Sequence, residues 1–367
     1  MLNALDLVRA IDKVVSEEFT SALSNFYGAG LMKILEVDED FVKGLKARYT
    51  FPIPEIKKTL DPIPSDTLYY TNMLNSQEYL NNNTMKTIEV ELTNFSYNLT
   101  FDINMLMRMV GEVTNYEPAK KLPQNIKNYI LYNIQSASTT YKQTIIKMVA
   151  DVITTGVANL GAGITYNVGP LYTFTGINNN FSSSTVDPIQ ELLKMRDQLV
   201  ADNQILPRYK KVIAIFGREA FNKFWNNANV KDRIKYFEMS AYDRELEINK
   251  VDYKPFVYRG RLENIDIFQA TGEAVLIGQG GLNDILDPDK LYMVCIIPSN
   301  IMILKHLKPE VSINKSSQVI LNWFENKDII IDRITSEYNP HLLKYVLRCS
   351  LGIITKFSRA IGNINIT

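Results

Sequence analysis

The segment from residue 48 to residue 92 constrains the fold more than any other part of this 367-residue chain. Prolines at 52, 54, 62 and 64 and an asparagine cluster at 81–83 exclude a helix over most of it. Its flanks, at 49–53 and 87–92, alternate in polarity or contain β-branched residues, as strands do. We therefore predict an extended excursion with two strand-like arms, which reaches on the order of 60 Å at roughly 3.3 Å per residue.

An excursion of this length needs a surface to bury against. Long irregular loops are uncommon inside compact domains, and the apolar residues of this one make disorder unfavourable. We therefore predict that the excursion lies on a partner, which could be another copy of the chain. The candidate contact residues are Lys57, Lys58, Leu68, Tyr69, Tyr70, Met73 and Leu74.

The clearest helix is expected at 123–155, with Pro123 at its first position and Gly156 as its stop. Its apolar residues recur in steps of three and four, which is the helical period. At 1.5 Å per residue the helix is about 50 Å long, well above the usual three turns. The stripe consists of Ile126, Ile130, Ile134, Ala137, Tyr141, Ile145, Met148 and Val152.

The second half of the chain mixes helices and strands. We predict a hairpin over 161–176, a polar boundary loop after it, and a helix that Asp187 caps, with Pro188 first and Gln190 placed for a capping box. A buried strand over 212–216 then leads into a helix with a broad aromatic face, and further strands follow. The fold class is α+β with long-range strand pairing. The expected core of this region is Phe216, Phe221, Phe224 and Trp225.

The order strand, Gly217, helix is also how many nucleotide sites begin. A dinucleotide site needs three glycines in G-x-G-x-x-G, whereas Gly217 stands alone and Glu219 follows in the first turn. The glycines at 156–163 and 278–281 lack the lysine and hydroxyl residue of a phosphate loop. We therefore predict turns at these places and no nucleotide cofactor.

Catalytic and metal-binding motifs are equally sparse. His306 and His341 are the two histidines, and neither lies in a metal or nucleophile motif. Cys295 and Cys349 lie in apolar strand-like runs and are expected to be buried thiols in a reducing compartment. We predict no enzyme, no metal and no cofactor.

Charge and hydropathy narrow the possible partners. Forty basic residues balance forty acidic ones without a basic block, so nucleic acid is not expected to be the main ligand. The N-terminus reads as an amphipathic helix rather than a signal peptide. The longest apolar stretch, 291–304, is interrupted at Pro298 and is too short to span a bilayer, so no membrane partner is expected.

This order of elements resembles the major capsid proteins of tailed bacteriophages, which have the Hong Kong 97-type fold, and among them the lambda-like capsid group. Four stretches carry the resemblance: RYTFPIPEIKKTL (48–60) with TIEVELTNFSYNLTFDINMLMRM (87–109), VIAIFGREAFNKFWNNANVKDRIKY (212–236), PFVYRGRLENIDIFQATGEAVLIG (255–278) with DPDKLYMVCIIPSN (287–300), and YVLRCSLGIITKFSRAIGNINI (345–366).

The resemblance implies a domain plan. It comprises an N-terminal arm at 1–47, an extended β-hairpin loop at 48–100, and a peripheral domain at 101–185 that contains the spine helix. An axial domain at 186–300 and return strands of the peripheral domain at 301–367 complete it.

The resemblance also implies partners and a location. The chain is expected to form the hexamers and pentamers of an icosahedral virion shell, assembled in the host cytoplasm around non-specifically contacted double-stranded DNA. A separate scaffold protein, a portal and a decoration protein are expected partners. A scaffold is expected because the arm begins at Met1, unless the chain is already processed. Some relatives form lysine–asparagine cross-links through the extended loop, but no asparagine or activating carboxylate is identifiable here.

Three alternatives stay open at this point. An encapsulin-like compartment would share the fold and enclose an enzyme cargo. An α/β enzyme with a site near Gly217 or Gly278 would need residues 48–92 to be a lid over its own domain. Another phage structural protein, such as a tail or minor capsid component, is the third. A lid closes over its own chain, whereas a shell loop projects away from it.

Overall fold

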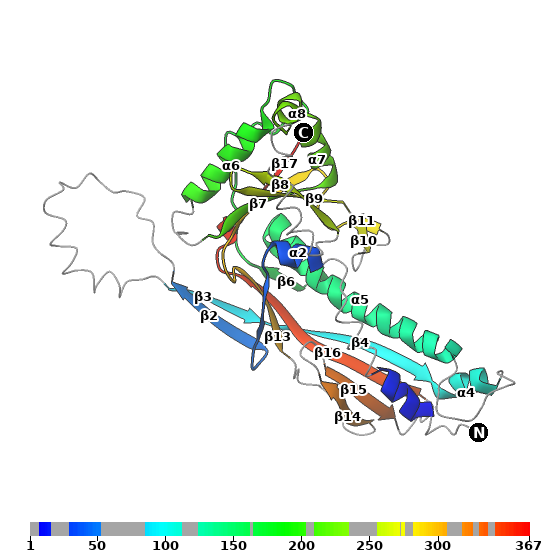
Figure 1. Cartoon of the computed structure of the whole chain (residues 1–367). Coiled ribbons are helices and arrows are strands. Elements are labelled where there is room, and N and C mark those ends of the chain that lie inside the picture. Colours follow the sequence, from blue (N-terminus) through cyan, green and yellow to red (C-terminus); the bar gives the residue numbers. More distant parts are fainter. Residues whose placement is uncertain are drawn as a thin grey trace, which may run out of the picture.

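The computed structural model describes residues 7–15, 29–52, 85–111, 124–161, 164–202, 209–234, 255–271, 273–275, 282–306, 318–325, 330–336 and 342–367. The predicted contact residues between 57 and 74, together with His341 and Gly278, lie outside these ranges. The described part contains two large sheets and several helices, which confirms the α+β class. Figure 1 shows an elongated unit with a long helix, and a compact unit at one end of it.

The elongated unit is built on a six-stranded sheet in the order β1-β13-β16-β15-β14, with β4 paired to β16. Strand β16 is central, because β4 pairs with one edge of it and β13 and β15 share the other. The strands are β1 (Asp38–Phe41), β4 (Thr93–Asp102), β13 (Ile301–His306), β14 (Gln318–Glu325), β15 (Ile330–Ser336) and β16 (Leu342–Thr355).

Strand β4 corrects one predicted boundary. We expected the extended loop to continue to residue 100, but β4 pairs with β16 from Thr93 onwards, up to Asp102 opposite Leu342. The reason is that the strand-like alternation continues without a break through Leu92, so the sequence pattern does not show where the chain joins the sheet.

The spine helix α5 (Gln124–Thr155) forms as predicted. All eight residues of the predicted stripe are buried, and the helix lies along the sheet between its two ends (Figure 1). Its buried face shares one apolar core with β4, β13 and β16. The last carbonyls of α5, those of Ile153 and Thr154, accept hydrogen bonds from Asn363 Nδ2 at 3.1 and 2.9 Å.

The compact unit contains a five-stranded sheet in the order β17-β12-β7-β9-β8. Residues of β7 alternate between two cores, with Ile213 and Ile215 facing the spine-helix core and Val212, Ala214 and Phe216 facing the helices of this unit. The elements are α6 (Pro188–Asp202), β7 (Lys211–Phe216), α7 (Arg218–Asn226), α8 (Ala228–Ile234), β8 (Phe256–Leu262), β9 (Ile265–Ala270), β12 (Lys290–Ile296) and β17 (Ile361–Asn365).

Strand β17 corrects a second boundary. We assigned residues 301–367 to the peripheral domain, yet β17 pairs with β12 in the five-stranded sheet, from Asn365 opposite Lys290 to Ile361 opposite Val294. Long-range pairing of this kind leaves no local signal, because any apolar strand has the same pattern in either sheet.

The smaller elements follow local sequence rules. Asp187 caps α6 as predicted, since its Oδ1 accepts from Ile189 N at 3.1 Å and Gln190 N at 3.4 Å. The predicted hairpin at 161–176 is shorter and earlier, formed by β5 and β6. These elements are a helix over 7–15, α2 (Ala29–Ile34), α4 (Ile103–Gly111), β5 (Val157–Gly161), β6 (Ile164–Asn167), β10 (Glu273–Val275), β11 (Leu282–Asp284) and the 3-10 turn Ser358–Ala360.

Candidate functional site

The N-terminus of α7 is already occupied by the chain itself. Ala220 N donates to Pro288 O at 2.9 Å, and Gly217 N donates to Lys290 O at 2.8 Å. A Cβ at Gly217 would lie 2.2 Å from Asp287 O, so the glycine permits a close backbone crossing. These donors are the groups that would hold a phosphate, and a neighbouring turn uses them.

The aromatic cluster on α7 is mostly internal. Phe216, Phe221 and Phe224 are buried, and the rings of Phe216 and Phe224 lie 4.9 Å apart. Trp225 differs from our expectation, because it is 39% exposed and stacks on Phe221 at 5.7 Å. It lies one turn after Phe221 and covers the ring of that buried residue from the solvent side.

The hairpin of β2 (Lys46–Pro52) and β3 (Met85–Glu91) is the feature that leaves the body of the protein. Its two strands pair only with each other among the described strands, and it projects away from both sheets (Figure 1). Ala47 and Leu92 at its base pack on Met302, Leu304 and Ile354 of the six-stranded sheet.

Polar contacts fasten the base of this hairpin. The Tyr49 hydroxyl donates to Asp40 Oδ2 on β1, and burial together with this carboxylate raises the pKa of Tyr49. Strand β1 is in turn tied to β13, where Lys305 is 1% exposed and pairs with Glu39 of β1 at 2.8 Å. The arm is therefore a rigid extension of the sheet at its base.

A bend at Leu92 separates β3 from β4. From Thr93 onwards, β4 pairs with the edge of β16. Strand β3, which precedes Leu92, instead crosses the face of the sheet. A Cβ at Gly352 would lie 3.2 Å from Val90 Cγ1, so this glycine permits the crossing. Among the described strands, none pairs with this edge of β16 beyond Leu351.

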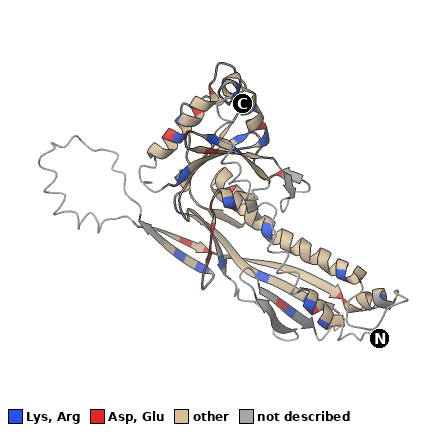
Figure 2. Ribbon diagram, viewed as in Figure 1, with Lys and Arg blue, Asp and Glu red and all other residues tan. Residues whose placement is uncertain are grey.

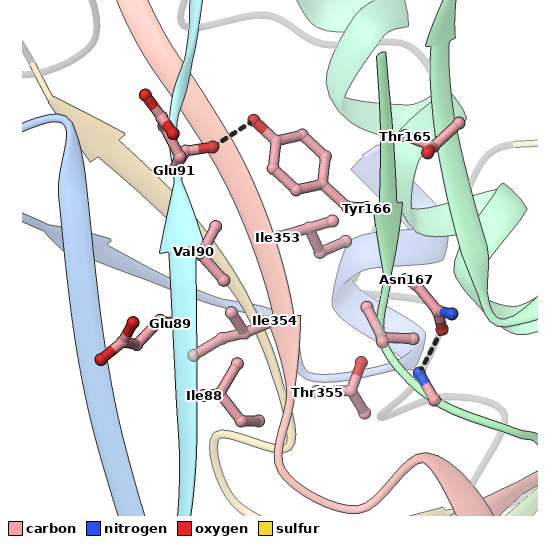
Figure 3. Close-up of a pocket in the computed structure, with 12 residues that line it drawn as sticks. Ile88, Glu89, Val90, Glu91, Thr165, Tyr166, Asn167, Ile353, Ile354 and Thr355 are labelled. Carbon is pink, nitrogen blue, oxygen red and sulfur yellow. Dashed lines mark hydrogen bonds between the residues drawn. The ribbon is translucent and has the colours of Figure 1, made fainter. Parts of the chain in front are cut away.

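A groove of about 560 Å³ opens at this bend. Figure 3 shows its three walls, formed by β3, β6 and the end of β16. The Tyr166 hydroxyl closes one end, 2.8 Å from Leu351 O and 3.0 Å from Glu91 O; burial raises the pKa of this hydroxyl. The lining residues are Ile88, Glu89, Val90, Glu91, Thr165, Tyr166, Asn167, Val168, Gly169, Ile353, Ile354 and Thr355.

The rim of the groove is acidic. Glu89 and Glu91 are both exposed on β3, and Figure 2 shows acidic positions on β3 beside basic positions on β2. Arg48 on β2 pairs with Glu89 at 3.5 Å. Sequence reasoning missed this groove because it arises where three distant segments meet; the strand pattern around Leu92 gives no sign of the bend.

The other chemical candidates have structural roles. His306 Nδ1 lies 2.9 Å from Val42 O, where it helps to hold the chain after β1 on the sheet. Cys295 and Cys349 are buried thiols that form no disulfide with each other. No group of three or more histidines, cysteines or carboxylates that could hold a metal comes together within the described ranges. None of the described helices is long and apolar enough to cross a membrane.

Comparison with known proteins gives structural matches only. No family model matches the chain, and no curated protein matches it. Among solved structures, it is similar to the capsid protein assigned to a prophage of E. coli CFT073, with 13% identity, a TM-score of 0.48 and coverage of 77% of this chain and 80% of the other.

Two further matches cover nearly the whole chain. The capsid asymmetric unit of cyanophage A-1(L) has 10% identity, a TM-score of 0.45 and coverage of 94% of each chain. The virus-like particle from Pyrococcus furiosus has 9% identity, a TM-score of 0.39 and coverage of 96% of this chain and 97% of the other.

Proposed function

We propose that this protein is a shell subunit of the tailed-phage capsid type, which associates with copies of itself to form a closed container. On the finer scale, we propose hexamers and pentamers that enclose double-stranded DNA as the phage virion capsid, assembled in the host cytoplasm. The scaffold, portal and decoration partners expected from the sequence belong to the same proposal.

The observation that carries the proposal is the direction of the β2–β3 hairpin. It leaves the six-stranded sheet at Leu92 and extends away from both sheets (Figure 1). A lid over an active site would instead close over its own domain. The occupied N-terminus of α7 also argues against an enzyme with a nucleotide site there.

The shell proposal also accounts for the chemistry of the chain. A structural subunit needs rigid elements and repeated weak contacts rather than a catalytic group, because closed symmetry multiplies each contact. The base of the hairpin is fastened to β1 by Tyr49, and β1 is tied to β13 by the pair Lys305–Glu39, so a projecting arm can transmit force to the sheet. An encapsulin-like compartment would share these features, and its distinguishing property would be an enclosed enzyme.

Small-angle X-ray scattering over a dilution series tests the proposal. A compact chain of this length would have a radius of gyration of about 21 Å. We expect a larger, anisotropic particle at low concentration, and rings or shells at higher concentration that electron microscopy can identify. A globular profile of about 21 Å at every concentration would contradict the proposal and favour a monomeric protein with a folded-back loop.

A further inference from the structure

The β2–β3 hairpin changes direction at Leu92, and one side chain from outside the hairpin contacts both sides of that bend. The Tyr166 hydroxyl on β6 lies 3.0 Å from Glu91 O, at the end of β3 (Figure 3), and 2.6 Å from Thr93 Oγ1, at the start of β4. The same hydroxyl lies 2.8 Å from Leu351 O on β16, the residue that pairs with Thr93. A single hydroxyl thus joins the arm, the bend and the sheet.

Tyr166 is itself anchored in the body of the protein. Its side chain is 9% exposed and belongs to the core under the spine helix. Strand β6 pairs with β5, from Val157 opposite Asn167, and β5 begins directly after Gly156 at the end of α5. The position of the hydroxyl is therefore fixed by the spine helix and its neighbours rather than by the hairpin.

Apolar packing alone leaves the angle of the hairpin poorly defined. Strand β3 crosses β16 at Gly352, where an added Cβ would lie 3.2 Å from Val90 Cγ1, and apolar contacts have no preferred direction. A hydrogen bond, by contrast, weakens steeply as its angle changes. The Tyr49–Asp40 bond fastens β2 to β1, and Tyr166 makes the corresponding polar contact on the β3 side.

The hydroxyl has one proton for two carbonyl acceptors. Tyr166 donates either to Leu351 O or to Glu91 O, and in both arrangements its oxygen can accept from Thr93. The contact with Leu351 is buried, whereas the contact with Glu91 is only partly buried, so water competes more effectively for the second. The bond to the arm can therefore be given up while β4 stays on the sheet.

We propose that Tyr166 is the positioning residue of the arm, whose hydroxyl sets the angle at which the β2–β3 hairpin leaves the sheet at Leu92. A chain without this hydroxyl keeps its fold and its hairpin, but the hairpin samples a wider range of directions. The role requires no second copy of the chain, so it is independent of the proposed function and can be measured on the monomer.

Distances between spin labels measure the direction of the arm at low protein concentration. The labels are attached at Lys86→Cys on β3 and at Thr139→Cys on the exposed face of α5, and the native thiols are buried. Position 86 lies about 17 Å along β3 from Glu91 at roughly 3.3 Å per residue, so a small change of angle displaces it measurably. We expect Tyr166→Phe to widen the distance distribution about twofold.

Hydrogen exchange provides a second readout. The Leu92 amide donates to Leu45 O at 2.7 Å, and its exchange reports local opening of the bend. We expect exchange in peptides across the bend to be roughly five- to tenfold faster in Tyr166→Phe. Thr93→Val keeps the branched shape and removes the second hydroxyl, so it should shift both readouts in the same direction by a smaller amount.

The matched control is Tyr292→Phe in the compact unit. This variant also removes a buried tyrosine hydroxyl, one that accepts from Asp287 N at 3.1 Å. It should lower the urea midpoint about as much as Tyr166→Phe does, without altering the label distances or the exchange at the bend. The comparison separates positioning of the arm from a general loss of stability.

The outcomes distinguish this inference from the proposed function. Unchanged label distances and unchanged exchange in Tyr166→Phe would overturn the role of Tyr166 and leave the shell proposal intact. Equal widening in Tyr292→Phe would also overturn it, because general loosening would then explain both variants. If Tyr166→Phe does not fold, Thr93→Val decides, and unchanged label distances in that variant overturn the role. Failure of the wild-type chain to self-associate would overturn the proposed function alone.

Discussion

At the scale of single residues, Gly217 shows how one missing side chain organises a whole junction. Its φ of −61° is open to any residue, so the requirement is space rather than backbone freedom. An added Cβ would lie 2.2 Å from Asp287 O and 2.5 Å from Pro288 O. The turn before β12 and the start of α7 can approach each other only because this position is a glycine.

We therefore expect Gly217→Ala to destabilise the protein by about 1–3 kcal/mol through overpacking. Gly44→Ala is the matched control, because nothing lies within 4 Å of an added Cβ there, and it should change stability little. Urea unfolding followed by circular dichroism measures both. Equal midpoints for the two variants would show that the turn at Asp287 can move aside.

At the scale of elements, the hairpin of β2 and β3 combines a fastened base with strands that pair only with each other among those described. Folding of the body and association through the arm should then be separable. The residues predicted to mediate association, Tyr69 and Tyr70, lie outside the described ranges, and their role stays a prediction.

Replacement of Tyr69 and Tyr70 by Ser should leave the unfolding transition unchanged and impair assembly, because buried aromatic residues contribute most to interfaces. Light scattering reports assembly, and circular dichroism reports folding. The matched control is Tyr132→Ser, which alters a 71% exposed tyrosine on the spine helix. Loss of monomer folding in the Tyr69 and Tyr70 variant would place these residues in a local core instead.

The elements also show how far sequence reasoning reaches. The spine helix and the cap of α6 were predictable because helical periodicity and capping are local properties. The buried core positions Phe216, Phe221 and Phe224 followed from the same pattern, whereas the outward turn of Trp225 did not. The placement of β17 and the groove at Leu92 depend on contacts between distant segments, which a single sequence does not encode locally.

At the scale of the whole molecule, strand β12 joins two cores. Tyr292, Val294 and Ile296 face the spine-helix core, while Met293 and Cys295 face the core of the compact unit. Burial raises the pKa of Tyr292 to about 12 and that of Cys295 to about 12. Because both protonated forms are favoured in the folded state, their stabilisation is complete below pH 9 and decreases as the pH rises towards 12.

We expect the free energy of unfolding to fall above pH 9 by about 1.4 kcal/mol per pH unit from Cys295 alone, and more steeply above pH 10 when Tyr292 joins. Cys295→Ala should remove the decrease in the free energy of unfolding that begins above pH 9. The loss of the sulfur atom changes the free energy of unfolding equally at every pH and so does not affect this slope. Denaturant unfolding at a series of alkaline pH values measures it. Identical slopes in the variant and the wild type would contradict the expected titration.

The position of β17 has a consequence for the order in which the protein can be made. Strand β12 emerges from a ribosome before residues 301–355, which supply four strands of the six-stranded sheet, and β17 emerges after them. The compact unit thus waits for its edge strand, and α5 for Asn363 at its last carbonyls, until translation has passed through the other sheet. In a nascent chain interrupted before residue 361, the edge of β12 that β17 covers in the complete fold would lack its partner strand. That edge would be exposed to chaperones and proteases.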